Sequence, residues 1–304
     1  MTHAITGLWP ALLMPFAEDG QLDLPRTLAH AKRMLAAGSD GVTLFGTTGE
    51  GLAFSVAERK MVLEALLASG VRPDQVIVTT TACALEEAID LGRHAIAKGV
   101  VRQLYMPPFF FNHPRDAGVT ECVTQVIKGI GADSLQMLLY HFPGLANVGY
   151  SHATITELVR RHPKQVIGVK DSSGDLEHSL GLVKAFPQLS IFVGSEPHIA
   201  PVMRAGGSGS VNGMSNVAPH LLRRIISNPQ NVSKADEQLV LDLLRLMTVL
   251  PGMPFVSAYK VGLAEQMGDD VWLNVRAPLT KLETHEEKAV REVYRATGQS
   301  FDTI

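Results

Sequence analysis

Short apolar segments alternate with helical segments along most of this chain, and the alternation occurs eight times before about residue 228. The apolar segments are bounded by glycine, proline or polar residues, which is typical of buried strands. Strands that alternate with helices in this way form a parallel sheet with right-handed crossovers. Because eight such units in about 225 residues is the size of a TIM barrel, the pattern predicts an α/β fold of the (β/α)8 class.

A doubly wound open sheet is the alternative arrangement of the same elements. Such a sheet commonly carries a glycine-rich phosphate-binding turn after its first strand. Here the first expected strand is followed by Ala17 to Gln21, which offer no phosphate cradle. The barrel is therefore favoured, and its expected strands are Leu8–Phe16, Gly41–Phe45, Val76–Thr81, Gln103–Met106, Gln136–Phe142, Val166–Lys170, Ser190–Val193 and Gly209–Met214.

Beyond about residue 229 the pattern contains helices only. Helices are expected over Asp236–Leu250, Pro254–Met267 and His285–Thr297, with no strand between them. We therefore expect a catalytic barrel over residues 1–228 and a helical C-terminal domain over residues 229–304. The apolar residues from Leu239 to Leu250 exceed what one barrel face needs, so these helices are expected to help set the oligomeric state.

Composition excludes several classes of function. The net charge is -3 without a long charged run, so neither nucleic acid nor a membrane is an expected partner. Cys83 and Cys122 form no disulfide framework or zinc spacing, and His113 and His141 have no ligand spacing, so no metal or other cofactor is expected. Residues 1–6 lack the pattern of a signal peptide, which favours a cytoplasmic protein.

Lys170 ends an apolar strand and is followed by Asp171, two serines and a glycine. Burying an ammonium group is costly, so a lysine at this place calls for an explanation. The carboxyl ends of barrel strands are where active sites are built, and a half-buried lysine there can act as an amine nucleophile. An exposed lysine paired with Asp171 is the alternative, and the strand alone leaves both readings open.

Two further features lie at the same end of the predicted barrel. Tyr140 ends the strand beside that of Lys170, about 5 Å away, so its phenol can reach the amine. The loop Gly46–Glu50 presents Thr47 and Thr48 between glycines, which suits the binding of a small carboxylate. A polar turn without a binding role would have the same sequence pattern. Together they predict a 2-oxo acid held as a Schiff base, with Tyr140 moving protons unless it is a core tyrosine. Glu50 is expected to be structural.

Five segments, in this order and spacing, resemble the dihydrodipicolinate synthase / N-acetylneuraminate lyase family of class I aldolases over nearly the whole chain. They are Gly46–Glu50, Tyr140–Pro143, Gly168–Gly174, Gly194–Glu196 and Val275–Leu279. The resemblance implies a TIM barrel with a C-terminal helical domain, assembled as a homotetramer. It implies pyruvate or another 2-oxo acid bound to Lys170, with Thr47 and Thr48 on the carboxylate and Tyr140 as proton relay. Its further implied substrate contacts are Gly49, Ser195, Glu196, Val211 and Asn212.

The chain departs from the synthase branch of that family at two places. The synthase has an arginine for the second substrate's carboxylate two residues after the proline of the tyrosine motif, where this chain has Leu145. It also has a second relay tyrosine in the loop after strand four, which here reads Phe109-Phe110-Phe111.

These departures favour a lyase that acts on a 2-keto-3-deoxy sugar acid, whose hydroxyls would meet Ser195, Glu196 and Asn212. A dehydratase of such acids, a true dihydrodipicolinate synthase and a non-catalytic 2-oxo acid sensor are the alternatives.

Overall fold

Eight parallel strands form one curved sheet in the computed structural model, which describes residues 5–252 and 254–299. The strand order is β1-β8-β7-β6-β5-β4-β3-β2. Residues 1–4, on which the expectation about a signal peptide partly rests, lie outside the described part. The strands are β1 Gly7–Leu8, β2 Val42–Leu44, β3 Val76–Thr79, β4 Arg102–Tyr105, β5 Gln136–His141, β6 Val166–Asp171, β7 Ser190–Val193 and β8 Gly209–Ser210.

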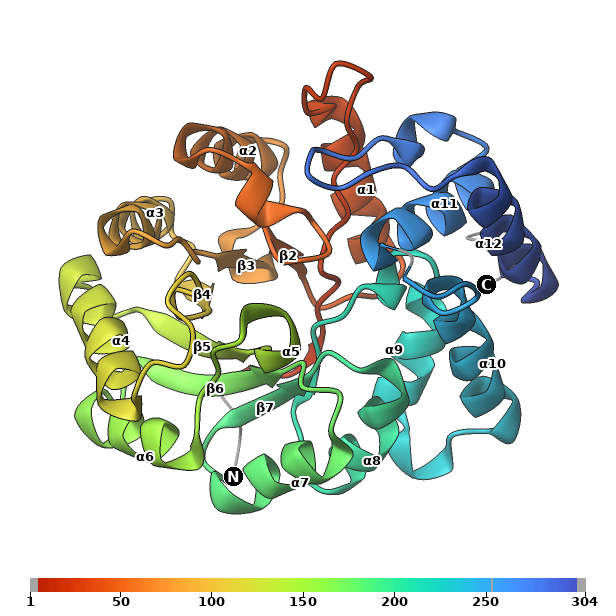
Figure 1. Cartoon of the computed structure of the whole chain (residues 1–304). Coiled ribbons are helices and arrows are strands. Elements are labelled where there is room, and N and C mark those ends of the chain that lie inside the picture. Colours follow the sequence, from red (N-terminus) through yellow and green to blue (C-terminus); the bar gives the residue numbers. More distant parts are fainter. Residues whose placement is uncertain (1–4, 253, 300–304) are drawn as a thin grey trace.

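The sheet closes between β1 and β2, just beyond the end of β1. Ala11 forms a parallel bridge with Thr43. The N–H of Leu12 donates to the carbonyl of Thr43 at 3.0 Å, and the N–H of Thr43 donates to the carbonyl of Pro10 at 2.8 Å. The strands therefore form a ring with helices on its outside (Figure 1), and the predicted (β/α)8 class is confirmed.

The first and last strands are shorter than predicted. The segment Leu8–Phe16 was expected as one strand, but β1 contains only 2 residues. Pro10 and Pro15 have no N–H to donate, so a regular ladder cannot continue through them. The eighth strand was expected to reach Met214, but it ends at Ser210, and a short 3-10 helix begins at Met214.

A helix follows each strand and covers the outer face of the ring (Figure 1). Local sequence fixes several helix starts. At α2 the Ser55 hydroxyl accepts the N–H of Glu58 at 3.2 Å, while the Glu58 carboxylate accepts the N–H of Ser55 at 2.8 Å, which is a capping box. In the described residues, no helix is both long and apolar enough to span a bilayer. The helices that follow the strands are α1 Leu24–Ala36, α2 Val56–Ala68, α3 Leu85–Ala97, α4 Asp116–Ile130, α6 His152–Arg161, α7 Leu176–Ala185, α8 Ile199–Arg204 and α9 Pro219–Ser227. The short helix α5 Pro143–Ala146 is inserted after β5.

Three C-terminal helices lie beside α9 and α1 (Figure 1): α10 Lys234–Leu244, α11 Phe255–Met267 and α12 Thr284–Ala296. The predicted helix Asp236–Leu250 is broken, since α10 ends at Leu244 and a 3-10 turn follows. Every residue of α11 from Val256 to Ala264 is buried, and α10 shares one hydrophobic cluster with α9. The extension therefore packs on the barrel of its own chain, while the division at residue 229 stays a prediction.

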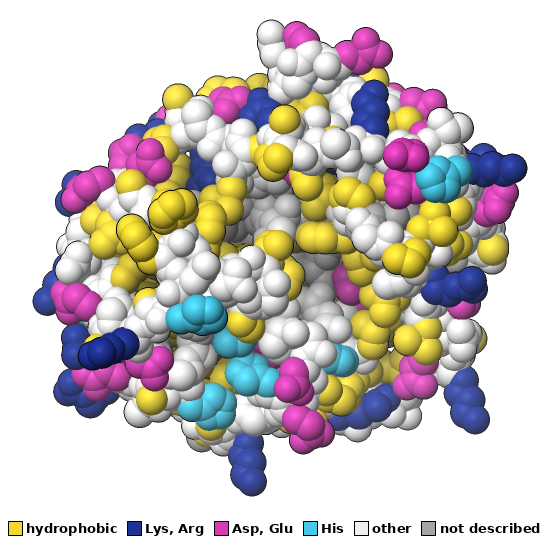
Figure 2. All heavy atoms as spheres, viewed as in Figure 1, with side chains coloured by type: hydrophobic (Ala, Val, Ile, Leu, Met, Phe, Trp, Pro, Cys, Tyr) yellow, Lys and Arg dark blue, Asp and Glu magenta, His cyan; other side chains and the backbone are white. Residues whose placement is uncertain are grey.

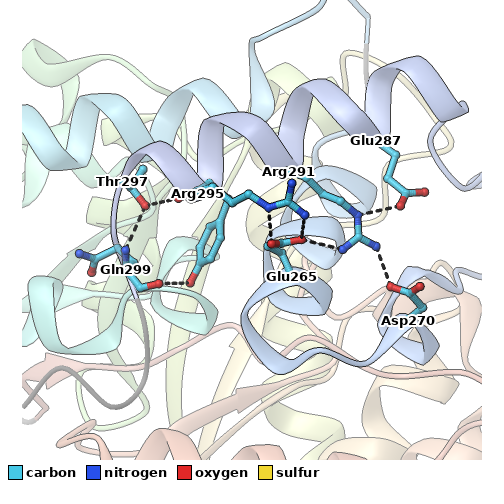
Figure 3. Close-up of polar contacts among 8 residues, drawn as sticks. Glu265, Asp270, Glu287, Arg291, Arg295, Thr297 and Gln299 are labelled. Atoms are coloured by element: carbon cyan, nitrogen blue, oxygen red, sulfur yellow. Dashed lines mark hydrogen bonds and ion pairs between the residues drawn. The ribbon is translucent and has the colours of Figure 1, made fainter.

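An ion-pair network joins the last two helices (Figure 3). Arg291 of α12 donates to Glu265 of α11 at 2.9 Å and to Asp270 at 2.6 Å. Its third nitrogen donates to Glu287 at 2.8 Å, and Arg295 reaches the same Glu265. Charges linked into a network contribute more than isolated surface pairs, so this cluster holds α12 against α11.

Candidate active site

Lys170 and Tyr140 are register partners on β6 and β5. Both side chains are buried, with 4% and 3% exposed, and Lys170 Nζ lies 4.0 Å from the centroid of the Tyr140 ring. The carboxylate of Asp171 points elsewhere, and it accepts hydrogen bonds from the Ser179 hydroxyl at 2.6 Å and the Ser173 N–H at 2.9 Å. The alternative of an exposed lysine paired with Asp171 is therefore not what the structure shows.

The loop after β2 presents its threonines to Tyr140. Thr47 Oγ1 lies 3.1 Å from the Tyr140 hydroxyl, and Thr48 is buried beside it. The loop is tight, because Glu50 adopts φ +54° and the N–H of Gly51 donates to the carbonyl of Gly46 at 3.1 Å. A side chain at Gly51 would meet backbone atoms at 1.8 Å, so only glycine fits this turn. The turn therefore positions the Thr47 hydroxyl beside the phenol of Tyr140, with Thr48 next to it in the chain.

A cavity of about 320 Å³ opens over Lys170. It brings together most of the residues that the sequence singled out, namely Thr47, Thr48, Tyr140, Lys170, Ser195, Glu196, Val211 and Asn212. Gly49 does not line it. A Cβ on Gly49 would lie 2.5 Å from the carbonyl oxygen of Leu12, so this glycine allows the loop to pack closely on the first barrel segment.

Glu196 enters the cavity wall from the turn after β7, and its carboxylate is already engaged. Oε1 accepts the N–H of Met214 at 3.1 Å and the hydroxyl of Tyr259 at 3.3 Å. Burial raises the pKa of Glu196, and these hydrogen bonds together with the charge of Lys170 oppose that rise. One carboxylate oxygen of Glu196 is therefore committed to holding the wall of the cavity together.

Asn212, which follows β8, is engaged at both ends of its amide. Its Nδ2 donates to the Ser210 hydroxyl at 2.7 Å. Its Oδ1 accepts from both the N–H and the hydroxyl of Ser215, at 2.9 and 2.8 Å. The side chain thus ties the end of β8 to the turn that follows, and it offers a substrate at most one remaining N–H.

Several cavity residues escaped the sequence analysis. Tyr259, Leu244, Met247 and Phe255 come from the C-terminal helices, and Phe142 follows the strand of Tyr140. No local pattern distinguishes them from ordinary core residues, because their role depends on how α10 and α11 return to the barrel mouth. Only the apolar character of these helices was visible in the sequence.

A histidine cluster lies on the outer side of the same strand ends. His141, Asp171 and His178 bring possible ligand atoms within 4.8 Å of one another. However, His141 Nδ1 accepts the N–H of Tyr150 at 2.9 Å, so the neutral ring carries its proton on Nε2, the nitrogen a metal would need. His178 Nδ1 lies 2.9 Å from the Asp171 carboxylate, which the Ser179 hydroxyl also occupies. We therefore interpret the cluster as a structural hydrogen-bond network and not as a metal site. Burial also lowers the pKa of His141 to about 4.

A neighbouring cavity of about 470 Å³ shares Thr47 and Tyr140 with the first. Leu145 and Phe109 line it, and so does Arg276, its one lining cation among the described residues. Each of the three guanidinium nitrogens of Arg276 already has a partner, because they donate to the carbonyls of Gly20 and Ala53 at 2.9 and 3.0 Å and to the Glu58 carboxylate at 2.6 Å. Among the described residues that line this cavity, the one arginine is therefore already engaged within the protein.

Known proteins resemble the chain in sequence and in fold. The model of the dihydrodipicolinate synthetase family matches residues 4–297. An uncharacterised DapA-like lyase of Chloroflexus aurantiacus is 33% identical over 295 residues, which is 95% of each chain. Dihydrodipicolinate synthase from Agrobacterium tumefaciens superposes with a TM-score of 0.90 at 31% identity, covering 96% of this chain and 99% of the other. N-acetylneuraminate lyase from Fusobacterium nucleatum shares the fold, with a TM-score of 0.81 at 22% identity, covering 96% and 99%.

Proposed function

Because the chain belongs to the dihydrodipicolinate synthetase family and is a lyase, we propose that it forms a Schiff base on Lys170. Its substrate in this proposal is pyruvate or a 2-keto-3-deoxy acid. One observation carries the proposal. A buried lysine amine lies against the ring of Tyr140, whose hydroxyl is hydrogen-bonded to Thr47, at the floor of an open cavity. A buried amine without a structural ion pair suits a nucleophile, and the adjacent phenol suits a proton relay.

The head of the substrate fits the loop after β2. Thr47 and Thr48 line the cavity, and a threonine hydroxyl can donate to a carboxylate. A 2-oxo acid held there presents its C2 ketone to Lys170 Nζ. Proximity of this kind converts an encounter in solution into a reaction between neighbouring groups. The loop therefore selects the acid end, and the lysine selects the ketone.

The proposed cleavage begins when the Lys170 amine adds to C2 and water leaves, which gives a protonated imine. Tyr140 then relays the proton of the C4 hydroxyl as the C3–C4 bond breaks. The electron pair of that bond flows into the imine, so that an enamine remains and an aldehyde departs. A proton returns to C3, and water hydrolyses the imine to release pyruvate and the free lysine. Condensation of pyruvate with an aldehyde is the reverse sequence.

The alternative of a true dihydrodipicolinate synthase has less support. Its second substrate carries a carboxylate, which loses water contacts as it enters the barrel mouth and needs a replacement. A charge-assisted arginine contact contributes roughly 1.5–3 kcal/mol there. Leu145 offers no donor, and the guanidinium of Arg276 is engaged elsewhere. We therefore favour an aldehyde partner without a negative charge. A dehydratase would use the same imine but expel water from the substrate.

We also propose a cytoplasmic homotetramer. Both cysteines, Cys83 and Cys122, are free thiols, which suits a reducing compartment. The tetramer rests on the family resemblance and on large apolar side chains exposed at the barrel mouth.

Reductive trapping tests the proposal. The protein is incubated with pyruvate and sodium borohydride, and the modified peptide is located by mass spectrometry. We expect one reduced pyruvate adduct on the peptide that carries Lys170, and none in Lys170→Ala. Lys260 is the matched control, because it is also buried but is ion-paired to Glu50. A label on Lys260, or no label at all, would contradict the proposal, while trapping without turnover of any substrate would favour the sensor.

A further inference from the structure

We infer, on the basis of the proposed function, that the substrate carries an apolar group beyond C4. This group is aliphatic or aromatic, and it takes the place of a polyhydroxylated or anionic chain. The structural basis is an apolar wall formed by Leu244, Met247 and Phe255, which faces the cavity that contains Lys170. This inference departs from the sugar acid that the sequence favoured. It concerns only the tail of the substrate, since the 2-oxo acid head meets the same groups in either case.

The apolar wall comes from the helices that flank the barrel mouth. Leu244 ends α10, Met247 lies in the following turn and Phe255 begins α11. Each is only partly buried, although each packs against the hydrophobic cluster that joins these helices to the barrel. Figure 2 shows this face hollowed at its centre, with hydrophobic side chains gathered to the right of the hollow, where Figure 1 places α10 and α11.

The wall continues onto the barrel itself. Phe142, after β5, stacks on Tyr140 with ring centroids 6.0 Å apart, and Val211 closes the floor beside β8. A group that fills the space between these residues and the apolar wall would remove hydrocarbon surface from water on several sides. A polyhydroxylated chain in the same space would lose water contacts without gaining partners. The apolar lining therefore favours binding of a hydrocarbon tail.

The polar groups nearest that space are largely committed to the protein. The amide of Asn212 is held by Ser210 and Ser215, and one oxygen of Glu196 is held by Met214 and Tyr259. A site that recognises several hydroxyls needs donors and acceptors that are not already hydrogen-bonded within the protein. Such a site discriminates because a ligand without those hydroxyls leaves its buried polar groups without partners.

Besides the hydroxyls placed at the head of the substrate, the lining offers those of Ser172, which follows the strand of Lys170, and Ser195, which follows the neighbouring β7. Their position suits the one hydroxyl that every aldol substrate carries, at C4. A longer run of hydroxyls would extend past them toward the apolar wall.

Charge excludes the anionic tail. Lys170 is the single cation among the described residues that line this cavity, and in the protonated imine its charge stays at C2, beside the carboxylate of the substrate head. Glu196 is the one acidic side chain in the same lining. The carboxylate of the head already balances the charge of the imine, so an anionic tail would find no second cation in this lining. A neutral hydrocarbon tail makes no such demand.

The first test compares three four-carbon aldehydes with pyruvate as donor: butanal, D-erythrose and L-aspartate 4-semialdehyde. We expect kcat/KM for butanal to exceed that for either polar aldehyde by about 10-fold or more, since one buried methylene changes specificity by about 10- to 200-fold. Borohydride trapping with pyruvate alone is run beside it. An imine with equal or better turnover of a polar aldehyde overturns the inference and leaves the proposed function standing, whereas no imine removes both.

The second test alters the wall with near-isosteric polar residues. Leu244→Asn and Met247→Gln should each lower the ratio of kcat/KM for butanal over D-erythrose by about 10-fold. Leu241→Asn is the matched control, because Leu241 lies on the same helix, is 48% exposed and does not line the cavity. If Leu241→Asn shifts the ratio as much as the wall variants do, or if the wall variants leave it unchanged, the inference fails.

Discussion

Lys260 on α11 and Glu50 in the loop after β2 form an ion pair in which the two side chains are 0% and 1% exposed. Lys260 also donates to the carbonyl of Asn274 at 2.6 Å, and Glu50 accepts the N–H of Arg276 at 2.8 Å. Burial lowers the pKa of Lys260 to about 8, against the attraction of Glu50. The pair fastens the loop that carries Thr47 to the C-terminal helices, so Glu50 has the structural role expected of it.

Removing one member of this pair should be costly. Glu50→Gln or Lys260→Met leaves the other charge buried without a partner, which costs roughly 3–5 kcal/mol of unfolding free energy. The double variant should lose less than the two single losses together. Urea denaturation of the four proteins measures both quantities. Lys60→Met provides the control, because the Lys60–Asp90 pair is 28% and 53% exposed and should matter little. Additive losses would show that the pair is not coupled.

Tyr140→Phe should separate chemistry from folding. The variant keeps the ring that Lys170 contacts but loses the hydroxyl that lies 3.1 Å from Thr47. Loss of a proton relay typically lowers kcat by about 10²–10⁴-fold, while the melting temperature should change little. Tyr294→Phe is the control, since its hydroxyl donates to the carbonyl of Gln299 and Tyr294 does not line the cavity. If kcat of Tyr140→Phe stays within a few-fold of wild type, the relay is another group.

The protein should be an oligomer. Two surfaces are candidates for the subunit interface, namely the C-terminal helices and the loop that carries Phe110 and Phe111. The apolar excess of the C-terminal helices is mostly packed inside the chain, since Leu243 and Leu246 are fully buried. Among the described residues, the two most exposed large apolar side chains instead follow β4, with Phe110 and Phe111 at 76% and 79% exposure. Light scattering after size exclusion should show a tetramer in the wild type.

The double change of Phe110 and Phe111 to Ser should yield a smaller species, and Leu241→Ser on α10 should not. The opposite result would place the interface on the C-terminal helices, as the sequence had suggested. A wild-type monomer at micromolar concentration would contradict both surfaces.

The proximity of Lys170 and Tyr140 was predictable because it depends on local patterns. An apolar strand that ends in Lys170, beside a strand that ends in Tyr140, requires only parallel register for the two to meet, and the ladder pairs them directly. The loop with Thr47 was recognisable because its glycines mark a turn that must bend sharply.

The distal half of the cavity was not predictable in this way. Leu244, Met247 and Phe255 reach it only because α10 and α11 fold back over the barrel mouth, and helix periodicity does not reveal which neighbour a face will meet. The substrate contacts of Glu196 and Asn212 were implied by the family resemblance and not by a local pattern. Their partners Tyr259 and Ser215 come from segments whose packing no sequence pattern specified.

Acid should destabilise the protein through buried neutral histidines. His30 on α1 is fully buried, and its Nε2 lies 2.8 Å from the Asn216 side chain, which also accepts the N–H of Leu13 at 3.0 Å. Burial lowers the pKa of His30 to about 4, below the value of about 6.5 expected in the unfolded chain. Between these values the unfolded state binds more protons, so the stability present above pH 6.5 is lost as the pH falls toward 4.

We expect this histidine to account for up to about 3 kcal/mol of the loss in unfolding free energy over that interval. Urea denaturation at a series of pH values measures it. His30→Gln should be less stable at pH 7, because it disturbs a buried contact, but its stability should fall less steeply between pH 6.5 and 4. His285→Gln is the control, since the His285 side chain is 69% exposed and should leave the slope unchanged. Parallel slopes for wild type and His30→Gln would mean that other groups, such as the carboxylates, govern the acid transition.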